Sequence, residues 1–238
     1  MNSPLDPDRR VILITGASRG IGAELAFALA GQGFHPILVA RGKSGLEAVD
    51  DRIKAIGQSA TLVPLDLRNG DDIDRMVQAI FGRFGRLDGL IGNAASLGGG
   101  LYPVGHIPYE KLAEVVAVNL AANWRLIRAC DPLLRAAPAG RAIFSTCAEA
   151  SGTHPFYGAY AASKAGLEAL VRAWAGEVEK TTLRINMVDP GPVATELRNL
   201  AFPGEDQSQL VKPAQVTPLF LDLLARDCRR HGQVLRFT

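Results

Sequence analysis

Cysteine and aromatic residues are scarce in this sequence, and long apolar runs are missing. Only three cysteines occur among 238 residues: Cys130, Cys147 and Cys228. An odd number of widely spaced cysteines does not suit a disulfide framework, so we expect reduced thiols in a cytoplasmic protein. Aromatic residues make up 6% of the chain, which argues against an aromatic platform for nucleic acids. No apolar run reaches the ~18 residues that a membrane span needs, so we expect no membrane partner.

The sequence also carries little excess charge. Lys and Arg total 26, Asp and Glu total 24, and no basic tract is longer than a pair of residues. Charge alone therefore gives no support for a nucleic-acid partner. The histidines and cysteines lack the spacing of metal ligands, so no metal site is expected. We interpret residues 1–9 as a polar leader and residues 10–238 as one domain of ordinary globular composition.

Short apolar runs alternate with helical patterns along this domain. The predicted strands are residues 11–15, 36–40, 60–65, 87–92, 142–146, 183–188 and 233–237. The predicted helices are residues 21–32, 43–56, 71–83, 109–136, 157–179 and 213–226. Apolar strands without polar alternation are typical of a parallel sheet covered on both faces. The pattern predicts an α/β fold: a single-domain, doubly wound Rossmann fold with a seven-stranded parallel sheet and helices on both faces. The polar, proline-bearing segment 190–213 is expected to be a lid or a disordered loop.

A glycine-rich turn follows the first predicted strand and opens the first helix. It consists of Thr15, Gly16, Ala17, Ser18, Arg19, Gly20, Ile21 and Gly22. Gly16 permits a tight turn, Gly20 lets the backbone approach a pyrophosphate, and Gly22 lets helix and strand pack closely. The placement favours a dinucleotide site, although a tight strand–helix turn without a ligand would use the same residues.

The end of the second predicted strand bears on which dinucleotide binds. Sites that prefer NAD place an acidic residue there, whereas this strand ends at Arg41. Arg41 and Arg19 together favour NADP(H), because a 2′-phosphate needs cationic donors. NAD(H) is the alternative cofactor.

Tyr160 and Lys164 lie four residues apart at the start of a predicted helix, so their side chains share one helical face. A nearby ammonium lowers the pKa of a phenol and makes it a general acid or base for a carbonyl or alcohol oxygen. The pair is common in isolation and gains weight from the glycine turn that precedes it.

These motifs together resemble those of the short-chain dehydrogenase/reductase family over residues 9–238. The residues that carry the resemblance stand in the family's order: 15–22, Asp66, Leu67, Asn93, Ala94, Asn119, 160–164, 189–191 and Thr195. The resemblance implies that Tyr160 donates or accepts the proton and that Lys164 binds the nicotinamide ribose. It places Asp66 and Leu67 beside the adenine and Asn93 and Ala94 in the next turn. Pro190, Gly191, Val193 and Thr195 would hold the nicotinamide amide.

Asn119 has support from its position as well. It falls in an apolar stripe of the predicted helix 109–136, formed by Leu112, Val115, Val116, Ala122, Leu126 and Cys130. A polar side chain on such a face needs hydrogen-bond partners. It is either a structural amide or, as the resemblance implies, a holder of water in a proton relay.

Cys147 departs from the family, which usually has serine thirteen residues before the tyrosine. A thiol is a weaker donor to a substrate oxygen, and loss of one such donor costs on the order of 10²–10³ in rate. Ser145 shares the face of Cys147 but stands too far back to replace the serine. The turn around Asn93 also departs, since Gly92 and Ala95 replace the family's Asn and Gly. Glu149, His154 and Tyr157 lie nearby, as substrate contacts or ordinary loop residues.

The sequence thus predicts an oxidoreductase that moves a hydride between NADP(H) and a small carbonyl or alcohol substrate. Tyr160, Lys164, Asn119 and Cys147 are the candidate catalytic residues. The long helices 109–136 and 157–179 resemble those through which family members form dimers and tetramers, so a homodimer or homotetramer is expected. Two alternatives stay open: a catalytically weak NADP(H)-binding scaffold or sensor, which Cys147 motivates, and an α/β protein for another ligand such as a methyl donor.

Overall fold

Aliphatic and β-branched runs form seven parallel strands in the computed structural model, which describes residues 9–237. The strands are β1 (Val11–Thr15), β2 (His35–Ala40), β3 (Thr61–Pro64), β4 (Gly89–Gly92), β5 (Arg141–Ser145), β6 (Arg184–Asp189) and β7 (Val234–Arg236). They lie in the order β3-β2-β1-β4-β5-β6-β7. Each predicted strand is confirmed to within two residues at either end. The predicted leader, residues 1–9, lies outside the described residues apart from Arg9.

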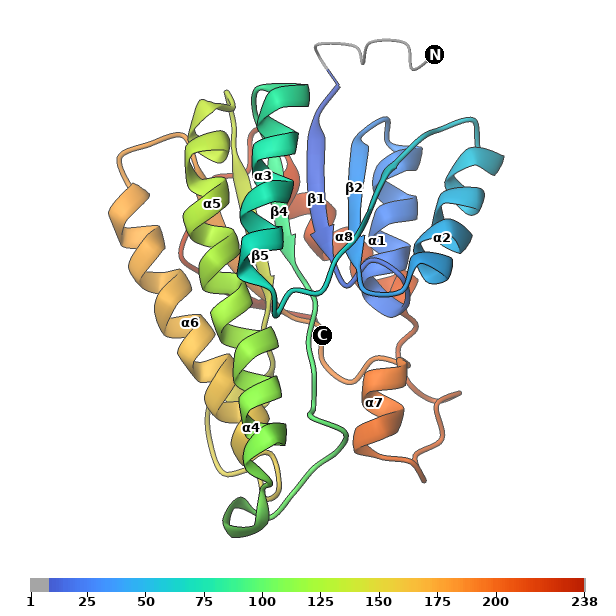
Figure 1. Cartoon of the computed structure of the whole chain (residues 1–238), viewed down its shortest axis with the longest axis vertical. Coiled ribbons are helices and arrows are strands. Elements are labelled where there is room, and N and C mark those ends of the chain that lie inside the picture. The colour runs from blue at the N-terminus through green and yellow to red at the C-terminus, as the bar shows by residue number, and fades with distance from the viewer. Residues whose placement is uncertain (1–8, 238) are drawn as a thin grey trace.

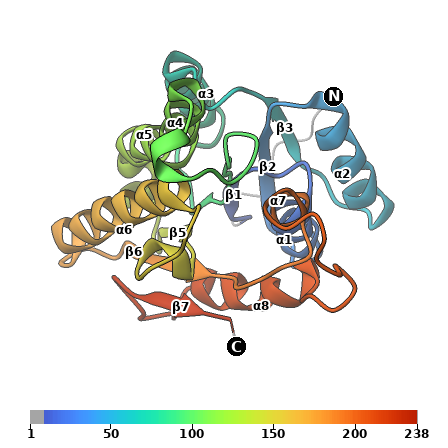
Figure 2. The same ribbon diagram turned by 90° about the horizontal axis from the view of Figure 1, so that it is seen from below.

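Helices cover both faces of this sheet, which confirms the predicted fold class (Figures 1 and 2). The α-helices are α1 (Gly20–Gly31), α2 (Lys43–Ala55), α3 (Gly70–Phe84), α4 (Tyr109–Val116), α5 (Ala122–Ala136), α6 (Gly158–Val178), α7 (Glu196–Ala201) and α8 (Pro213–Leu224). Helices α3, α5 and α6 pack on one face, and α1, α2 and α8 pack on the other. Among the helices of residues 9–237, none is both long enough and apolar enough to cross a membrane.

Alternate side chains of the central strand point into two separate cores. Val11 and Leu13 of β1 pack with α3, α5 and α6, whereas Ile12 and Ile14 pack with α1, α2 and α8. All four are at most 4% exposed. Because the strand is buried on both faces, it needs apolar residues at every position, and this explains the missing polar alternation.

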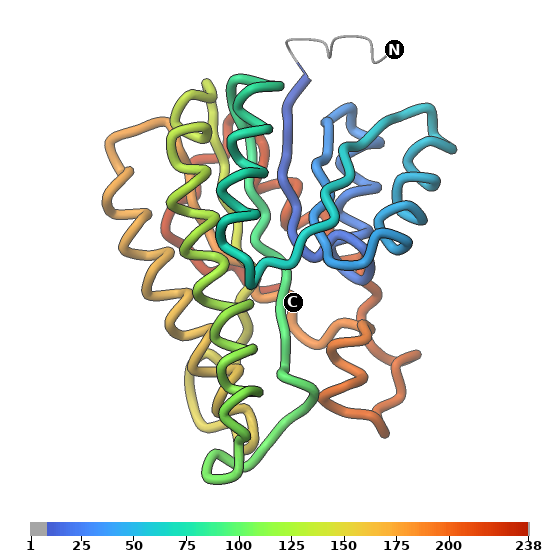
Figure 3. The backbone as a smooth tube through the Cα atoms, viewed as in Figure 1, coloured from blue at the N-terminus to red at the C-terminus, as the bar shows by residue number. Residues whose placement is uncertain are grey.

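The topology places a crevice at the carboxyl end of β1. This strand pairs with β2 on one side and β4 on the other, so the connections leaving β1 and β4 diverge to opposite faces of the sheet. Ligands of open α/β sheets bind at such a point. The strands' carboxyl ends point downward in Figure 1, and the tube in Figure 3 follows the chain from β4 past this edge to the start of α4.

Two predicted segments differ from the structure. The predicted helix 109–136 is interrupted by a π-helical turn, η2 (Ala117–Ala121), between α4 and α5. The segment 190–213, predicted to be a loop, contains α7, whose first turn Thr195 caps by accepting a hydrogen bond from the Arg198 amide. Its polar composition hides this short helix, which lies in front of α1 near the ends of β1 and β2 in Figure 2.

Candidate active site

The glycine turn between β1 and α1 has the shape that its residues predict. Gly16 has φ +68° and Gly20 has φ +56°, backbone conformations that favour glycine. A Cβ at Gly22 would lie 2.2 Å from the Gly16 carbonyl oxygen. Arg19 precedes α1 in an extended conformation, and no side chain of the described residues caps the helix there. The first backbone amides of α1 are therefore available to donate hydrogen bonds to an anionic group in the cleft.

A cavity of about 1010 Å³ opens beside this turn. Eleven of the predicted cofactor residues line it: Gly16, Ser18, Arg19, Gly20, Ile21, Arg41, Asp66, Leu67, Asn93, Ala94 and Thr195. The lining also includes residues that the sequence analysis did not single out, among them Glu24, Ser96, Glu114, Val118, Glu196 and Lys212. The remaining predicted residues, including Tyr160 and Lys164, lie outside this lining.

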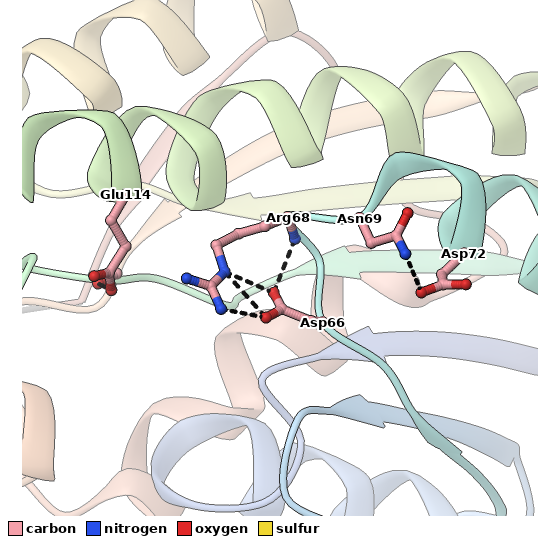
Figure 4. A network of polar contacts seen from close by, with 6 residues as sticks. Asp66, Arg68, Asn69, Asp72 and Glu114 are labelled. Atoms are coloured by element: carbon pink, nitrogen blue, oxygen red, sulfur yellow. Dashed lines mark hydrogen bonds and ion pairs between the residues drawn. The ribbon is translucent and has the colours of Figure 1, made fainter. Parts of the chain in front are cut away.

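Several charged side chains line the cavity, and some of them form ion pairs with one another or with neighbouring residues. Asp66 accepts a bidentate hydrogen bond from Arg68, with Arg68 Nη2 2.5 Å from Asp66 Oδ2. This hydrogen bonding holds the pKa of Asp66 below its usual value. Figure 4 shows the Arg68 side chain extended toward Glu114 of α4 while it binds Asp66. Arg19 forms an ion pair with Glu196, the first residue of α7.

A chain of hydrogen bonds crosses the carboxyl ends of β1, β4 and β5. Thr15 Oγ1 accepts from the Asn93 and Ala94 amides at 3.0 and 3.1 Å. Asn93 Nδ2 donates to the Thr15 carbonyl, and Ser145 Oγ donates to Asn93 Oδ1 at 3.3 Å. Lys164 Nζ then donates to the Ser145 carbonyl at 2.8 Å. Asn93 thus joins three strands, which fixes the loop it belongs to.

Lys164 and Tyr160 are brought together at the start of α6. Lys164 is only 1% exposed, and its Nζ lies 5.6 Å from the centre of the Tyr160 ring. Burial lowers the pKa of Lys164 to about 8. Burial also raises the pKa of Tyr160 above its usual value, whereas the sequence analysis expects the ammonium to lower it. In the structure the loss of solvation comes first, and nearby acidic groups such as Glu149 and Asp189 act in the same direction, so the phenol keeps its proton.

Cys147 stands two residues beyond the end of β5, on extended backbone. Burial, together with the nearby Glu149 carboxylate, raises the pKa of the thiol to about 12, so it stays neutral. Ser145 hydrogen-bonds to Asn93 and therefore does not take over the usual serine position. Thr146 faces α6 instead, where its hydroxyl donates to Glu168 at 2.6 Å.

Asn119 is fully buried in the π-helical turn η2. Its Oδ1 accepts from the Ser96 amide at 2.8 Å, and its Nδ2 donates to the Ser96 carbonyl and to Ser163 Oγ, each at 3.0 Å. The side-chain amide thus binds the loop after β4 to α6, which fits the structural alternative. The prediction that Leu112 belongs to a buried apolar stripe is wrong. Its side chain is 37% exposed, because α4 extends beyond the edge of the sheet.

The segment after β6 adopts a fixed path into α7. Gly191 has φ +68°, and its amide donates to Asp189 Oδ1 at 3.0 Å. Val193 is 4% exposed and pairs with Val211 through its backbone. Pro190 lies between Asp189 and Gly191, which this hydrogen bond joins. Val193 is therefore held in place by burial and by this backbone pairing.

Aromatic side chains surround Tyr160 on the side of α7. Tyr157 meets Tyr160 edge-on, with ring centres 6.3 Å apart, and Phe202 meets Tyr157 at 6.2 Å. The ring centre of His154 lies 6.5 Å from that of Tyr157. In the sequence, Tyr157 and His154 are either substrate contacts or ordinary loop residues. The contact with Phe202 cannot be inferred from the sequence, because the segment of α7 that brings Phe202 is distant along the chain.

The sequence and the fold are similar to those of known short chain dehydrogenases. The family model described as short chain dehydrogenase matches residues 10–206. The chain is 35% identical over 224 residues to the uncharacterized oxidoreductase YciK of Escherichia coli K12, covering 93% of this chain and 88% of that protein. A short chain dehydrogenase structure from Salmonella enterica serovar Typhi matches with TM-score 0.92 and 32% identity over 99% of this chain and 98% of that one. A putative short chain dehydrogenase of Escherichia coli CFT073, complexed with NADPH, matches with TM-score 0.90 and 34% identity over 95% of each chain.

Proposed function

The chain belongs to the short-chain dehydrogenase family of oxidoreductases, and we propose that it interconverts a carbonyl and an alcohol with NADP(H) as its cofactor. The observation that carries this proposal is the Lys164 ammonium. It is buried, held by the Ser145 carbonyl at the end of β5, and placed 5.6 Å from the Tyr160 ring centre. Burying a charged group is costly, so such an arrangement is typical of functional sites.

The residues around the crevice fit a phosphorylated dinucleotide. The glycine turn leaves space that Cβ atoms would fill, because a Cβ at Gly16 would lie 3.0 Å from Ala94 Cα and one at Gly20 3.3 Å from Thr195 Cγ2. Arg19 and Arg41 line the same cavity and supply the cationic donors that a 2′-phosphate needs. The NADPH bound to the Escherichia coli CFT073 relative supports this choice. We therefore propose NADP(H) as the preferred cofactor and NAD(H) as the weaker one.

Each side chain has a role in the proposed reaction. When bound, the nicotinamide supplies or accepts the hydride. Tyr160 donates its phenolic proton to the carbonyl oxygen during reduction, and its raised pKa keeps that proton available. Lys164 stabilises the phenolate that forms and hydrogen-bonds the ribose. Cys147 offers a neutral thiol to the substrate oxygen, and Asn119 holds the loop after β4 in place beside the cofactor.

Cofactor binding and turnover test this proposal separately. NADPH fluorescence should report binding to the wild-type protein, and a panel of ketones should show NADPH oxidation. Tyr160→Phe should lower kcat by about 10²–10⁴ while leaving the Kd for NADPH unchanged, because only the proton donor is lost. Equal turnover by wild type and Tyr160→Phe would contradict the assigned role.

A weakly catalytic NADP(H)-binding scaffold is the second candidate, and the thiol of Cys147 favours it. The high pKa of this thiol and its weak donor strength give little stabilisation to a developing oxyanion. Cys147→Ser should then raise kcat by about tenfold or more with the Kd for NADPH unchanged. Efficient turnover by wild type, with no gain in the serine variant, would exclude the scaffold.

We further propose that the protein works as a homodimer or homotetramer in the cytoplasm. Large apolar side chains on α4 and α5 support the assembly, since Tyr109 is 82%, Leu112 37% and Trp124 46% exposed. The three free cysteines suit a reducing compartment. Light scattering after size exclusion should show an oligomer that Trp124→Glu dissociates, and a monomeric wild type would contradict the assembly.

A further inference from the structure

Three aromatic rings connect the proposed proton donor to α7. Tyr160 on α6 contacts Tyr157, which immediately precedes that helix, with an interplanar angle of 67°. Tyr157 in turn contacts Phe202, which follows α7, at 38°. All three residues are partly exposed. Edge and tilted contacts at these separations are the arrangements that aromatic rings prefer. A surface of π faces and edges therefore borders the place where the substrate oxygen must meet Tyr160.

The charge beside these rings is balanced within the protein. Arg198 lies 4.0 Å from the centre of the Phe202 ring. Its Nε and Nη2 atoms donate to the two carboxylate oxygens of Glu205, each at 2.6 Å. Burial raises the pKa of both Tyr157 and Cys147, and the nearby Glu149 carboxylate raises each of them further. Because Glu205 neutralises Arg198, this pair offers no net positive charge to an anionic substrate, and the Glu149 carboxylate beside Tyr157 disfavours one.

The position of Phe202 allows it to cover a substrate. It follows a six-residue helix whose base is fixed by the Thr195 cap and the backbone pairing of Val193 with Val211. The far end of that helix is more exposed, with Leu200 at 44%. A flat group stacked on Tyr157 would occupy the side now met by Phe202, and Phe202 would then cover its outer face.

We propose that Tyr157 and Phe202 form a ring pair that selects neutral carbonyl or alcohol substrates carrying an aromatic or other flat apolar group. This inference rests on the proposed function and names its substrate class. Both residues contact the substrate through their aromatic rings, so they determine specificity. Tyr160 remains the proton donor. Stacking supplies both orientation and affinity, because it fixes the plane of the carbonyl attached to the ring.

Three ketones test the substrate class. Acetophenone and 2-octanone contain the same number of carbon atoms and differ in the flat ring, and 4-acetylbenzoate adds a negative charge to the ring compound. Wild-type protein should reduce acetophenone with a kcat/KM roughly tenfold above that of 2-octanone. It should reduce 4-acetylbenzoate more slowly than acetophenone. Fluorescence titration gives the Kd for NADPH in the same samples.

Four variants assign the preference to the rings. Phe202→Ala and Tyr157→Ala should each bring the acetophenone to 2-octanone ratio close to one, while Tyr157→Phe keeps the ratio because it keeps the ring. Phe81→Ala is the matched control, since Phe81 on α3 is 60% exposed and makes the same chemical change elsewhere. Its ratio should equal that of wild type. Thermal unfolding of each variant checks that the fold is intact.

The outcomes separate this inference from the proposed function. Reduction of both ketones at equal kcat/KM, or an unchanged ratio in Phe202→Ala, overturns the ring pair and leaves the oxidoreductase standing. A loss in Tyr157→Phe as large as in Tyr157→Ala also overturns it, because the hydroxyl would then carry the recognition. Turnover of neither ketone by the NADPH-saturated protein contradicts the proposed function and this inference with it.

Discussion

A methyl group at Gly22 would lie 2.2 Å from the Gly16 carbonyl oxygen and 2.9 Å from Asn93 Nδ2. Both neighbours belong to the fixed end of the sheet, so neither can move without disturbing the glycine turn. We expect Gly22→Ala to lower the free energy of unfolding by about 1–3 kcal/mol and to weaken NADPH binding. Chemical denaturation and a fluorescence titration measure the two effects.

Gly31 supplies the control within the same helix. A Cβ there would meet only Ile56 Cδ1, at an ordinary 3.9 Å. Gly31→Ala should therefore be neutral or stabilise the protein by up to about 1 kcal/mol, as alanine does in helices. Equal stability for Gly22→Ala and Gly31→Ala would show that the turn tolerates a side chain, against the structure.

Lys164 should make stability depend on pH in an unusual direction. Its ordinary pKa of 10.5 describes the unfolded chain, and burial lowers it to about 8 in the folded protein. Below pH 8 both states hold the proton, so folding bears the cost of burying the charge. Between about pH 8 and 10.5 the unfolded chain binds more protons, so the contribution of Lys164 to the free energy of unfolding rises with pH.

A comparison with Lys164→Met isolates this effect from the other groups that titrate in alkali. The wild-type free energy of unfolding minus that of the variant should rise across this range, by up to about 3 kcal/mol. Urea denaturation at a series of pH values provides the measurement. A difference that stays flat, or that falls with pH, would show that the folded protein does not disfavour the charged lysine.

At the scale of elements, two buried arginines hold the carboxyl end of α8. Arg141 is 3% exposed and donates to the carbonyls of Ala225, Arg226 and Cys228 at 3.1, 2.6 and 3.3 Å. Arg10 donates to the Leu224 carbonyl at 2.7 Å. These carbonyls have no partner within the helix, so the guanidinium groups replace a helix cap.

Removing Arg141 should therefore destabilise the protein strongly. Arg141→Met keeps much of the buried stem but removes the side-chain donor to the Arg226 and Cys228 carbonyls, and we expect a loss of about 3 kcal/mol or more. Arg75→Met is the control, because Arg75 is 68% exposed in its ion pair with Asp72 and such pairs contribute little. A Tm for Arg141→Met as high as that of Arg75→Met would refute the capping role.

The elements themselves were predictable where burial sets the pattern. The strand β1 was predicted without error, because a strand buried on both faces must be apolar throughout. The helix α7 was missed, since a six-residue polar helix lying over a cleft has no apolar stripe to reveal it. The apolar stripe of residues 109–136 does not predict the π-helical turn, and the hydrogen bonds of Asn119 within that turn reach the distant residues Ser96 and Ser163.

At the scale of the whole molecule, the sequence revealed residues whose role is local and missed those that act through distant partners. Gly16, Gly20 and Arg41 could be placed from their positions next to single strands. Glu196 and Phe202 could not, because each contacts a residue brought by another element, Arg19 and Tyr157 respectively. The raised pKa of Tyr160 belongs to the same class, since burial by several elements sets it.

The charge pattern of the cleft shows the consequence for cofactor choice. Arg19 comes from the glycine turn, Arg41 from the end of β2, and Glu196 from α7, and all three line one cavity. Arg19 is paired with Glu196, so a 2′-phosphate must compete with that carboxylate for the guanidinium. We expect Glu196→Gln to raise the preference for NADPH over NADH by roughly three- to fivefold at low salt, and less at high salt.

Arg41→Ala should act in the opposite direction, lowering the preference for NADPH by about tenfold or more, because a phosphate dianion loses a charge-assisted hydrogen bond. Kd values for both cofactors, measured at two ionic strengths, give these ratios directly. Glu47→Gln is the matched control, since it removes a carboxylate that pairs with Lys43 on α2. A preference that is unchanged in Glu196→Gln, or that changes equally in Glu47→Gln, would mean that the ion pair with Arg19 has no part in cofactor selection.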